Sequence, residues 1–587
     1  MAACTPVAPG PTAADAEAFV TAAETRLFGL RQEAERTAWR RETFVDTETT
    51  ATATAAAAAL RAAAAELAHG AARFDGLDLP ATTVRKLTLL KTAPATVAPR
   101  HPPLEAELAD LLAALKRTYG SGAYCYGAGE DCLDRAALDR AVAELRDTDR
   151  LLELWEDGRA LASSMGSRYE RLVEIANAGA VELGYADAGH RWRSAWGLPT
   201  RALQAELERL WNQVRPLYES LHCLVRAELG DQYGTAIAPP RETIAAHLLG
   251  DSGDGRWSGV HDLVAPHTRG RGYDPTRQLE RGRVSPLEMV RYGERFFASL
   301  GFDPLPATFW ERSVFVRPPE HRVVCRARAW NLDGQDDLRL KLCLEVTGND
   351  FVAVHRELTH AYQQWAHRSQ EPLFRTGADD ALVEAAAGAV ALSVTPAYLV
   401  ELGLLDRAPP ADAYDVPSLL RRALDEIASL PFALLADRWR WRVFAGDVEP
   451  ERYNQAWWEL RESYQGVRPP APRREADFDP GVSRRIAVAV PYVPDFLARI
   501  LQFQLHGALC AAAGADGPLH RCTIFGSAEA GARLRAVMEM GAAGRPWPVA
   551  IEALTGARQM DASALLEYFA PLAAWLDQQN AGRACGW

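Results

Sequence analysis

Residues 351–393 contain the one cluster in this chain with the pattern of a metal site, and they read FVAVHRELTHAYQQWAHRSQEPLFRTGADDALVEAAAGAVALS. The segment predicts a helix on which Glu357 and His360 have the spacing of the second half of a His-Glu-x-x-His zinc motif. Glu384 adds a carboxylate twenty-four residues after His360. In such sites a glutamate acts as general base, while histidine and carboxylate side chains bind the metal.

The first histidine of that motif is missing. Two imidazoles four residues apart lie on one face of a helix, about 40° apart around its axis. Here the residue four positions before His360 is Arg356. His355 is five positions away, about 140° around the helix, so these two histidines cannot hold one ion together. We interpret His355 as a core or groove histidine, and the segment as a zinc site that lacks one ligand.

The chain as a whole has helical patterning, and its 587 residues with 48% hydrophobic content can bury a large core. Alanine- and leucine-rich segments with charges at helical spacing run through residues 14–118 and 147–230. Two short strands are expected within residues 321–344. No repeat or clear linker divides the chain, so we expect one large α-helical domain, residues 14–587, after an N-terminal tail, residues 1–13.

Six of the nine cysteines form close pairs in the sequence, which are Cys125 with Cys132, Cys325 with Cys343, and Cys510 with Cys522. Such pairs predict disulfides that close short loops, and hence an oxidising compartment. The alternative is that these cysteines are unpaired thiols buried at scattered positions in the core. None of the pairs has the Cys-x-x-Cys spacing of a zinc or redox motif.

Small residues before Cys4 and a Pro/Ala-rich tail after it are typical of a bacterial lipoprotein cleavage site whose upstream half is absent. They predict a lipid anchor at Cys4 and a periplasmic or extracellular location. No complete signal peptide is expected, and the sequence predicts no transmembrane segment. The formal net charge of −12 argues against a nucleic-acid partner. The oligomeric state is not indicated.

Several long motifs, in a fixed order from about residue 30 to the end, together resemble the angiotensin-converting-enzyme-type peptidyl-dipeptidases. They are VHRELTH, VEAAAGAVALSVTPAYL, RWRWRVFAGDVEPERYNQAWWELRESYQG, FDPG, VPY, LQFQLHGALCAAAG, GPLHRC, DAGHRWRS, AHLLG and CRARAW. The resemblance implies a mainly α, two-lobed helical ellipsoid with a deep central groove and a zinc site on the groove floor. It also implies an N-terminal helical lid, here residues 14–118, a few short strands beside the metal-site helix, and disulfides at the three cysteine pairs.

The resemblance assigns roles to positions that this sequence retains. It places Glu357 at the general base, and His360 and Glu384 at two of three zinc ligands. It also places Ala327 at a contact to the substrate backbone and Tyr492 at a contact to the C-terminal carboxylate of the substrate. A buried chloride site is retained as Arg193, Trp457 and Arg461.

The departures from the family pattern fall on its chemistry. Arg356 replaces the first zinc histidine, and Gly388 replaces the aspartate that orients a metal-bound imidazole. Arg326 replaces a substrate-binding histidine, and Ser483 replaces the lysine that anchors the substrate carboxylate. Arg485 and Asp495 replace the histidine and the tyrosine that stabilise the oxyanion. Pro494 replaces an arginine of a second chloride site.

These changes bear first on the metal. Catalytic zinc needs three protein ligands, and a permanently protonated Arg356 repels a dication, so we expect zinc to be absent or weakly bound. An alternative is that Asp495 or another carboxylate joins His360 and Glu384 in an oxygen-rich manganese or magnesium site.

Paired charges are tolerated inside a protein, so we expect Arg356 to pair with Glu384 or Glu357, and Arg485 to pair with Asp495. The sequence thus predicts a converting-enzyme-like homologue with little or no peptidase activity, whose groove can hold a peptide or a partner. The alternative is an active zinc-dependent peptidyl-dipeptidase that releases C-terminal dipeptides, with Glu357 activating a metal-bound water.

Overall fold

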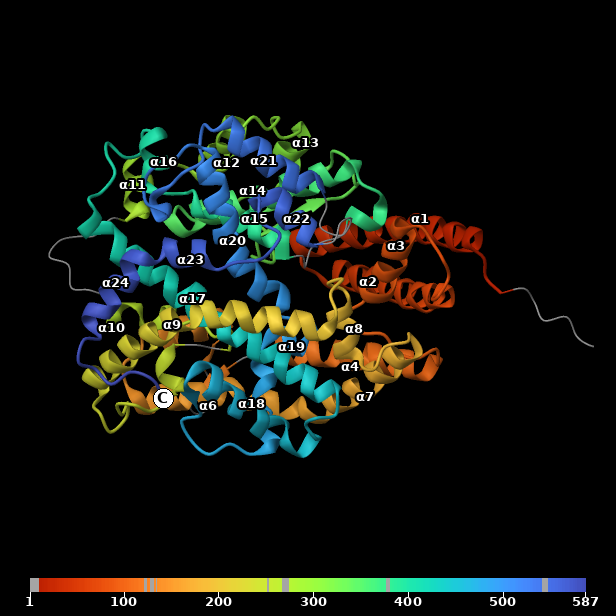
Figure 1. The fold of residues 1–587 in the computed structure, drawn as a ribbon, viewed down its shortest axis with the longest axis horizontal. Coiled ribbons are helices and arrows are strands. Elements are labelled where there is room, and N and C mark those ends of the chain that lie inside the picture. Colours follow the sequence, from red (N-terminus) through yellow and green to blue (C-terminus); the bar gives the residue numbers. More distant parts are fainter. Residues whose placement is uncertain are drawn as a thin grey trace, which may run out of the picture.

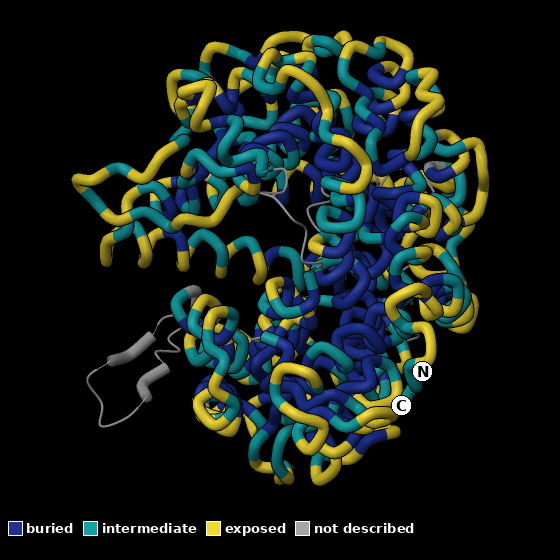
Figure 2. The backbone as a smooth tube through the Cα atoms, turned by 90° about the vertical axis from the view of Figure 1, so that its left-hand side faces the viewer, coloured by how far each residue is buried: buried dark blue, intermediate teal, exposed yellow. Residues whose placement is uncertain are grey.

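The computed structural model describes residues 10–120, 124–126, 131–133, 135–250, 253–265, 274–375, 381–540 and 547–587. The fold is mainly α-helical, as predicted, and the described strands form three sheets of two strands each. In Figure 1 the helices form an upper half, with α12, α14, α20 and α21, and a lower half, with α6, α7, α9 and α18. The first three helices extend from one side. Figure 2 shows buried backbone in the interior of both halves and exposed backbone around them.

The first three helices form a small layer with its own apolar core. They are α1 (Ala13–Thr43), α2 (Thr47–Ala71) and α3 (Ala81–Thr92). Helix α4 (Pro102–Gly120) follows them in the chain, but its buried residues belong to the main core and it packs against α7. Capping boxes, Thr12 with Asp15 and Asp46 with Thr49, begin α1 and α2, because each side chain satisfies a backbone N–H that the first turn leaves unpaired. Val20, Leu67 and Leu87 are among the buried residues that hold α1, α2 and α3 together.

Among the polar contacts that join this layer to the body, three lie beside one small sheet. The Arg328 guanidinium lies 2.9 Å from Glu35, and the Lys341 ammonium lies 2.6 Å from Glu42. Gln32 donates to the carbonyl oxygen of Asp333. These contacts fix α1 beside the antiparallel pair β4 (Arg328–Asn331) and β5 (Leu338–Lys341), which lie within the segment predicted to form strands.

The centre of the body is built on three helices that meet closely. They are α14 (Gly348–Ala366), α15 (Ala381–Leu392) and α20 (Val493–Ala512), and α17 (Ala411–Phe444) packs against α20. Helix α15 is alanine-rich and almost wholly buried, since small side chains let neighbouring helices approach. The remaining elements that bear on the site are α8 (Ala188–Ser194), α9 (Thr200–Tyr233), α18 (Tyr453–Gln465) and α19 (Arg484–Ala487).

The outer helices complete both halves. They are α5 (Arg135–Glu144), α6 (Thr148–Ala160), α7 (Gly166–Glu182), α10 (His261–Val264), α11 (Pro275–Arg281), α12 (Pro286–Ser299), α13 (Ala307–Arg312), α16 (Pro396–Glu401), α21 (Ala528–Met540), α22 (Trp547–Thr555), α23 (Ser563–Tyr568) and α24 (Ala570–Gln579). The other two sheets pair β1 (Tyr124–Tyr126) with β2 (Asp131–Leu133), antiparallel, and β3 (Ile244–Ala245) with β6 (Val467–Arg468), parallel.

Two of the predicted disulfides are confirmed, Cys325–Cys343 and Cys510–Cys522. The side chains of Cys125 and Cys132 lie outside the described residues. A further disulfide, Cys223–Cys585, was not predicted, because its cysteines are 362 residues apart and sequence proximity gives no signal at that separation. Disulfides of this kind are typical of proteins that fold in an oxidising compartment. None of the described helices has the length and apolar character needed to cross a lipid bilayer.

Candidate active site

A cavity of about 2500 Å³ lies between the N-terminal helices and the body. Its walls include residues of α1 to α4 on one side and of β4, α14 and α15 on the other. The sequence-predicted site residues that line it are Arg326, Ala327, Arg356, Glu357, His360, Glu384 and Pro494. We call this cavity the groove.

On the groove wall, Arg356 donates to Glu384, with 2.5 Å between Nη2 and Oε2. Arg356 and His360 are four residues apart on α14, so they face the same way, and α15 brings Glu384 opposite both of them. His360 Nε2 lies 3.8 Å from the same Glu384 oxygen. The sequence left two carboxylates open as partners of Arg356, and it is Glu384 that receives the ion pair.

The two glutamates of the site respond differently to this arrangement. Burial acts to raise the pKa of Glu384, but the charges of His360 and Arg356 outweigh it, and the pKa lies below the ordinary value. Burial raises the pKa of Glu357 above its ordinary value, and there the same two cations oppose it only in part. Glu384 is therefore held ionised, while Glu357 retains a proton more readily.

His355 points away from the groove into the core. It is fully buried, with Nδ1 2.7 Å from the carbonyl oxygen of Phe351 and Nε2 3.0 Å from the Tyr398 hydroxyl. Burial lowers its pKa to about 4. The interpretation of His355 as a core histidine agrees with this placement.

The residues of the predicted metal site do not fit a catalytic zinc ion. His360 and Glu384 are two donors where three are required, and Glu384 already accepts a bond from a guanidinium. Asp495, the carboxylate proposed to complete an oxygen-rich site, is bonded to Arg485 instead.

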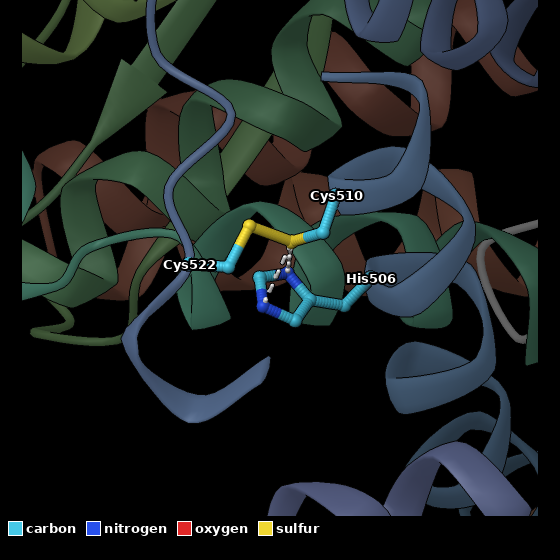
Figure 3. Close-up of side chains that lie close together, drawn as sticks. All are labelled: His506, Cys510 and Cys522. Atoms are coloured by element: carbon cyan, nitrogen blue, oxygen red, sulfur yellow. Dashed lines mark hydrogen bonds between the residues drawn. A yellow bond between two sulfur atoms is a disulfide. The ribbon is translucent and has the colours of Figure 1, made fainter. Parts of the chain in front are cut away.

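Elsewhere in the described part of the chain, one group of side chains comes close enough to share an ion: His506, Cys510 and Cys522. Both sulfurs of this group are joined in a disulfide, which leaves no thiolate to bind a metal (Figure 3).

Arg485 and Asp495 form the second ion pair expected from the sequence. Arg485 Nε lies 2.5 Å from Asp495 Oδ2, and Arg485 Nη2 donates to Oδ1 over 2.7 Å. A third nitrogen, Nη1, donates to the carbonyl oxygen of Pro491. The guanidinium is thus turned toward groups of its own chain. Burial raises the pKa of Asp495, and Arg485 and Arg499 oppose that rise.

Ser483 and Tyr492 are bonded to each other within the protein. Their hydroxyl oxygens are 2.5 Å apart and both side chains are buried. The Tyr492 amide also donates to the buried carboxylate of Asp437. Neither residue is among those that line the groove. Arg326, in contrast, is exposed on the groove wall beside Ala327.

The predicted chloride residues lie on α8 and α18. Arg461 is buried, with its guanidinium 5.5 Å from the ring of Phe432, and the Trp457 ring is 5.7 Å from the same phenylalanine. Arg193 lies over Trp441 at 5.0 Å, and its Nε and Nη1 atoms are buried without a hydrogen-bond partner among the described residues. Such orphaned guanidinium atoms are compatible with a bound anion.

Comparison with known proteins agrees with the fold. Residues 11–587 match the family model described as angiotensin-converting enzyme. The chain is 41% identical over 455 residues to the angiotensin-converting enzyme of Oryctolagus cuniculus, which covers 77% of this chain and 34% of the relative. It is 37% identical over 453 residues to that of Theromyzon tessulatum, covering 77% of this chain and 73% of the relative.

A third relative is the angiotensin-converting enzyme-like protein Ace3 of Mus musculus, 36% identical over 482 residues, with 81% of this chain and 65% of the relative covered. The chain spans about a third of the length of the mammalian angiotensin-converting enzymes that it matches. The match over residues 11–587, the Theromyzon tessulatum relative and the helical architecture agree, and we conclude that this chain belongs to the angiotensin-converting enzyme family of metallopeptidases.

Proposed function

We propose that this chain is a family member that has lost efficient peptidase chemistry and that holds a peptide or a partner segment in its groove. The observation that carries the proposal is the Arg356–Glu384 ion pair. The family is zinc-dependent, and this pair places a permanent positive charge against one of the two retained ligands. A dication at His360 and Glu384 would have to break the pair and lie beside the guanidinium.

The oxyanion positions support the proposal independently of the metal. Loss of a single preorganised donor typically lowers a rate by about 10² to 10³. Here Arg485 is directed to Asp495 and to a backbone carbonyl, and Asp495, when ionised, would repel a developing negative charge. The altered carboxylate anchor adds to this effect, since Ser483 carries no charge and is bonded to Tyr492.

The second candidate function is an active peptidyl-dipeptidase. It is favoured by one observation: Glu357 and His360 both line the groove, and burial raises the pKa of Glu357, as general bases in peptidases require. In that case zinc, or a harder metal such as manganese, would displace Arg356 from Glu384.

Elemental analysis of purified protein, together with an assay for dipeptide release from a blocked tripeptide, distinguishes the two candidates. The proposal predicts that the protein contains far less than one zinc ion per chain. It also predicts that the assay detects no chelator-sensitive release of dipeptides. Near-stoichiometric metal with chelator-sensitive dipeptide release would overturn it. For the compartment we propose a periplasmic or extracellular location with a lipid anchor at Cys4. Mass spectrometry of the protein isolated from its native cells would detect acylation at that residue.

A further inference from the structure

Four cations around the groove have no carboxylate partner. Arg61 on α2, Lys116 on α4, Arg326 before β4 and Arg484 at the start of α19 are all exposed. Within the described part of the chain, none of these side chains forms an ion pair or a hydrogen bond. We call them the groove cations. They come from four separate segments, so the fold alone brings them together.

Geometry and electrostatics both place the groove cations close to one another. Arg61 and Arg326 line the groove. Lys116 and Arg484 are not among the lining residues, but α19, which begins with Arg484, packs against α4, which carries Lys116. The pKa of Lys116 is lowered, first by burial and then by the positive charges of Arg41, Arg61 and Arg484. The pKa of Arg326 is lowered by burial and next by Arg484. Each cation therefore raises the cost of charging its neighbours.

The nearest carboxylates do not neutralise the cluster. Glu42 opposes the pKa shifts of both Lys116 and Arg326, but its own oxygens already contact Arg41 at 3.0 Å and Lys341 at 2.6 Å. Glu357 also opposes the pKa shift of Arg326, with a smaller effect than Glu42. Glu35, the other acid of α1 that faces this strand, is bonded to Arg328. The groove cations are thus a local excess of positive charge, two of them on the groove wall and two outside it, in a chain whose net charge is −12.

We propose that the groove cations bind an acidic peptide segment, whose carboxylates would enter the groove between α2, α4 and α19. The inference rests on the proposed function, in which the groove holds a peptide, and it specifies the charge of that peptide. Guanidinium groups bind carboxylates through paired hydrogen bonds, and a cleft with walls of one charge concentrates ligands of the other. At the position of the family's carboxylate-anchoring lysine this chain has Ser483, so negative charge would be recognised elsewhere, by two cations of the N-terminal helices and two of the body.

A peptide fits the charge distribution better than a nucleic acid does. A nucleic acid would extend beyond the groove onto the rest of the surface. Because the chain has 77 acidic and 65 basic residues, that surface would repel the phosphates. A short acidic segment meets only the local excess of cations.

Fluorescence anisotropy tests the inference with two labelled nine-residue peptides, one rich in Asp and Glu and the other its Asn and Gln counterpart. We expect the full chain at low salt to bind the acidic peptide at least about tenfold more tightly, and added salt to reduce that preference. The double variant Arg61→Glu/Lys116→Glu should lose about tenfold or more in affinity for the acidic peptide, and Arg326→Glu/Arg484→Glu should do the same. The matched control is Arg407→Glu, since Arg407 is exposed, does not line the groove and is not among the main charges that act on Lys116 or Arg326.

The outcomes separate the two proposals. Equal affinity for both peptides, an equal loss in the control variant, or tighter binding of a single-stranded oligonucleotide than of the acidic peptide would overturn this inference. Cleavage of either peptide would overturn the proposed function, while a preference for the acidic peptide would still support the inference. Thermal denaturation of each variant verifies that the reversed side chains, all on the surface, leave the fold intact.

Discussion

The amide oxygen of Gln502 lies where a side chain at position 388 would begin. A Cβ atom added to Gly388 would be 2.0 Å from Gln502 Oε1 and 2.8 Å from its Cβ atom. Helices α15 and α20 therefore approach each other across a position that only glycine fits. Gln502 also donates to Glu426, which fixes its side chain in that space. The aspartate that the family resemblance places at 388 cannot be restored here without moving Gln502.

Gly388→Ala should lower the free energy of unfolding by about 1–3 kcal/mol, because the new methyl group overlaps Gln502 in a packed interior. Urea denaturation measures the change. In the Gln502→Ala background the loss should be smaller, since the amide that causes the closest contact is absent. Gly507→Ala on the same helix as Gln502 is the control: its Cβ would make only ordinary contacts, so stability should stay equal or rise by up to about 1 kcal/mol. Equal effects at 388 and 507 would contradict this account of the packing.

Arg356→His should raise the zinc content of purified protein and restore little peptide hydrolysis. The change removes the repelling charge and adds a third ligand, but Arg485, Asp495 and Ser483 still occupy the altered positions, and each missing oxyanion donor costs about 10² to 10³ in rate. Arg356→Gln is the matched control, since it removes the charge and adds no ligand. Family-like rates from Arg356→His alone would show that the other altered positions matter little.

Replacing the two groove glutamates should change stability in opposite directions. The pKa of Glu384 is lowered in the folded state, so its contribution is present at neutral pH and is lost as the pH falls through the folded pKa. Glu384→Gln should therefore destabilise the protein at pH 7, by about 0.5–1 kcal/mol for a pair that is partly exposed to solvent, and have less effect in acid.

The pKa of Glu357 is raised, so the folded state binds its proton more tightly than the unfolded chain, and stability falls as the pH rises from the unfolded pKa toward the folded one. Glu357→Gln should raise the melting temperature at pH 7 and leave it nearly unchanged at acid pH. Calorimetry of both variants at two pH values measures this; a shift of the same sign for both at pH 7 would contradict the electrostatic assignment.

Removal of the Cys223–Cys585 disulfide should destabilise the protein by about 2–4 kcal/mol, because it closes a loop of 362 residues. The C-terminal segment should be released as well. Trp587 packs against His222, with ring centroids 4.6 Å apart, and Arg226 donates to the carbonyl oxygens of Ala584 and Gly586. Double Cys→Ser variants, compared by thermal denaturation and by limited proteolysis of the C-terminus, measure both effects. Removal of Cys510–Cys522, which are 12 residues apart, should cost less.

Part of the site follows from local geometry that a sequence contains. The four-residue spacing of Arg356 and His360 places both on one face of any helix that contains them, and α14 is that helix. The helical class follows from periodicity over many segments. The two short-range disulfides follow from cysteines close in sequence, since short loops keep such cysteines near each other.

Other features depend on segments that are far apart in the sequence. From the sequence, either Glu384 or Glu357 could pair with Arg356. The packing of α15 against α14 brings Glu384 into contact with Arg356. The overlap of position 388 with Gln502 requires the distance between α15 and α20, and Cys223 could not be paired with Cys585 from spacing. The four groove cations lie on segments from residue 61 to residue 484, and of the four only Arg326, in CRARAW, belongs to a motif quoted above.

The sequence by itself determined the helical class, the family likeness and the residues that replace its catalytic groups. Only the tertiary structure decided which of two carboxylates pairs with Arg356 and which cations remain unpaired. The physical reason is range: helix periodicity acts over a few residues along the chain, whereas electrostatic and steric contacts act over a few ångströms in space, between segments that only the fold brings together.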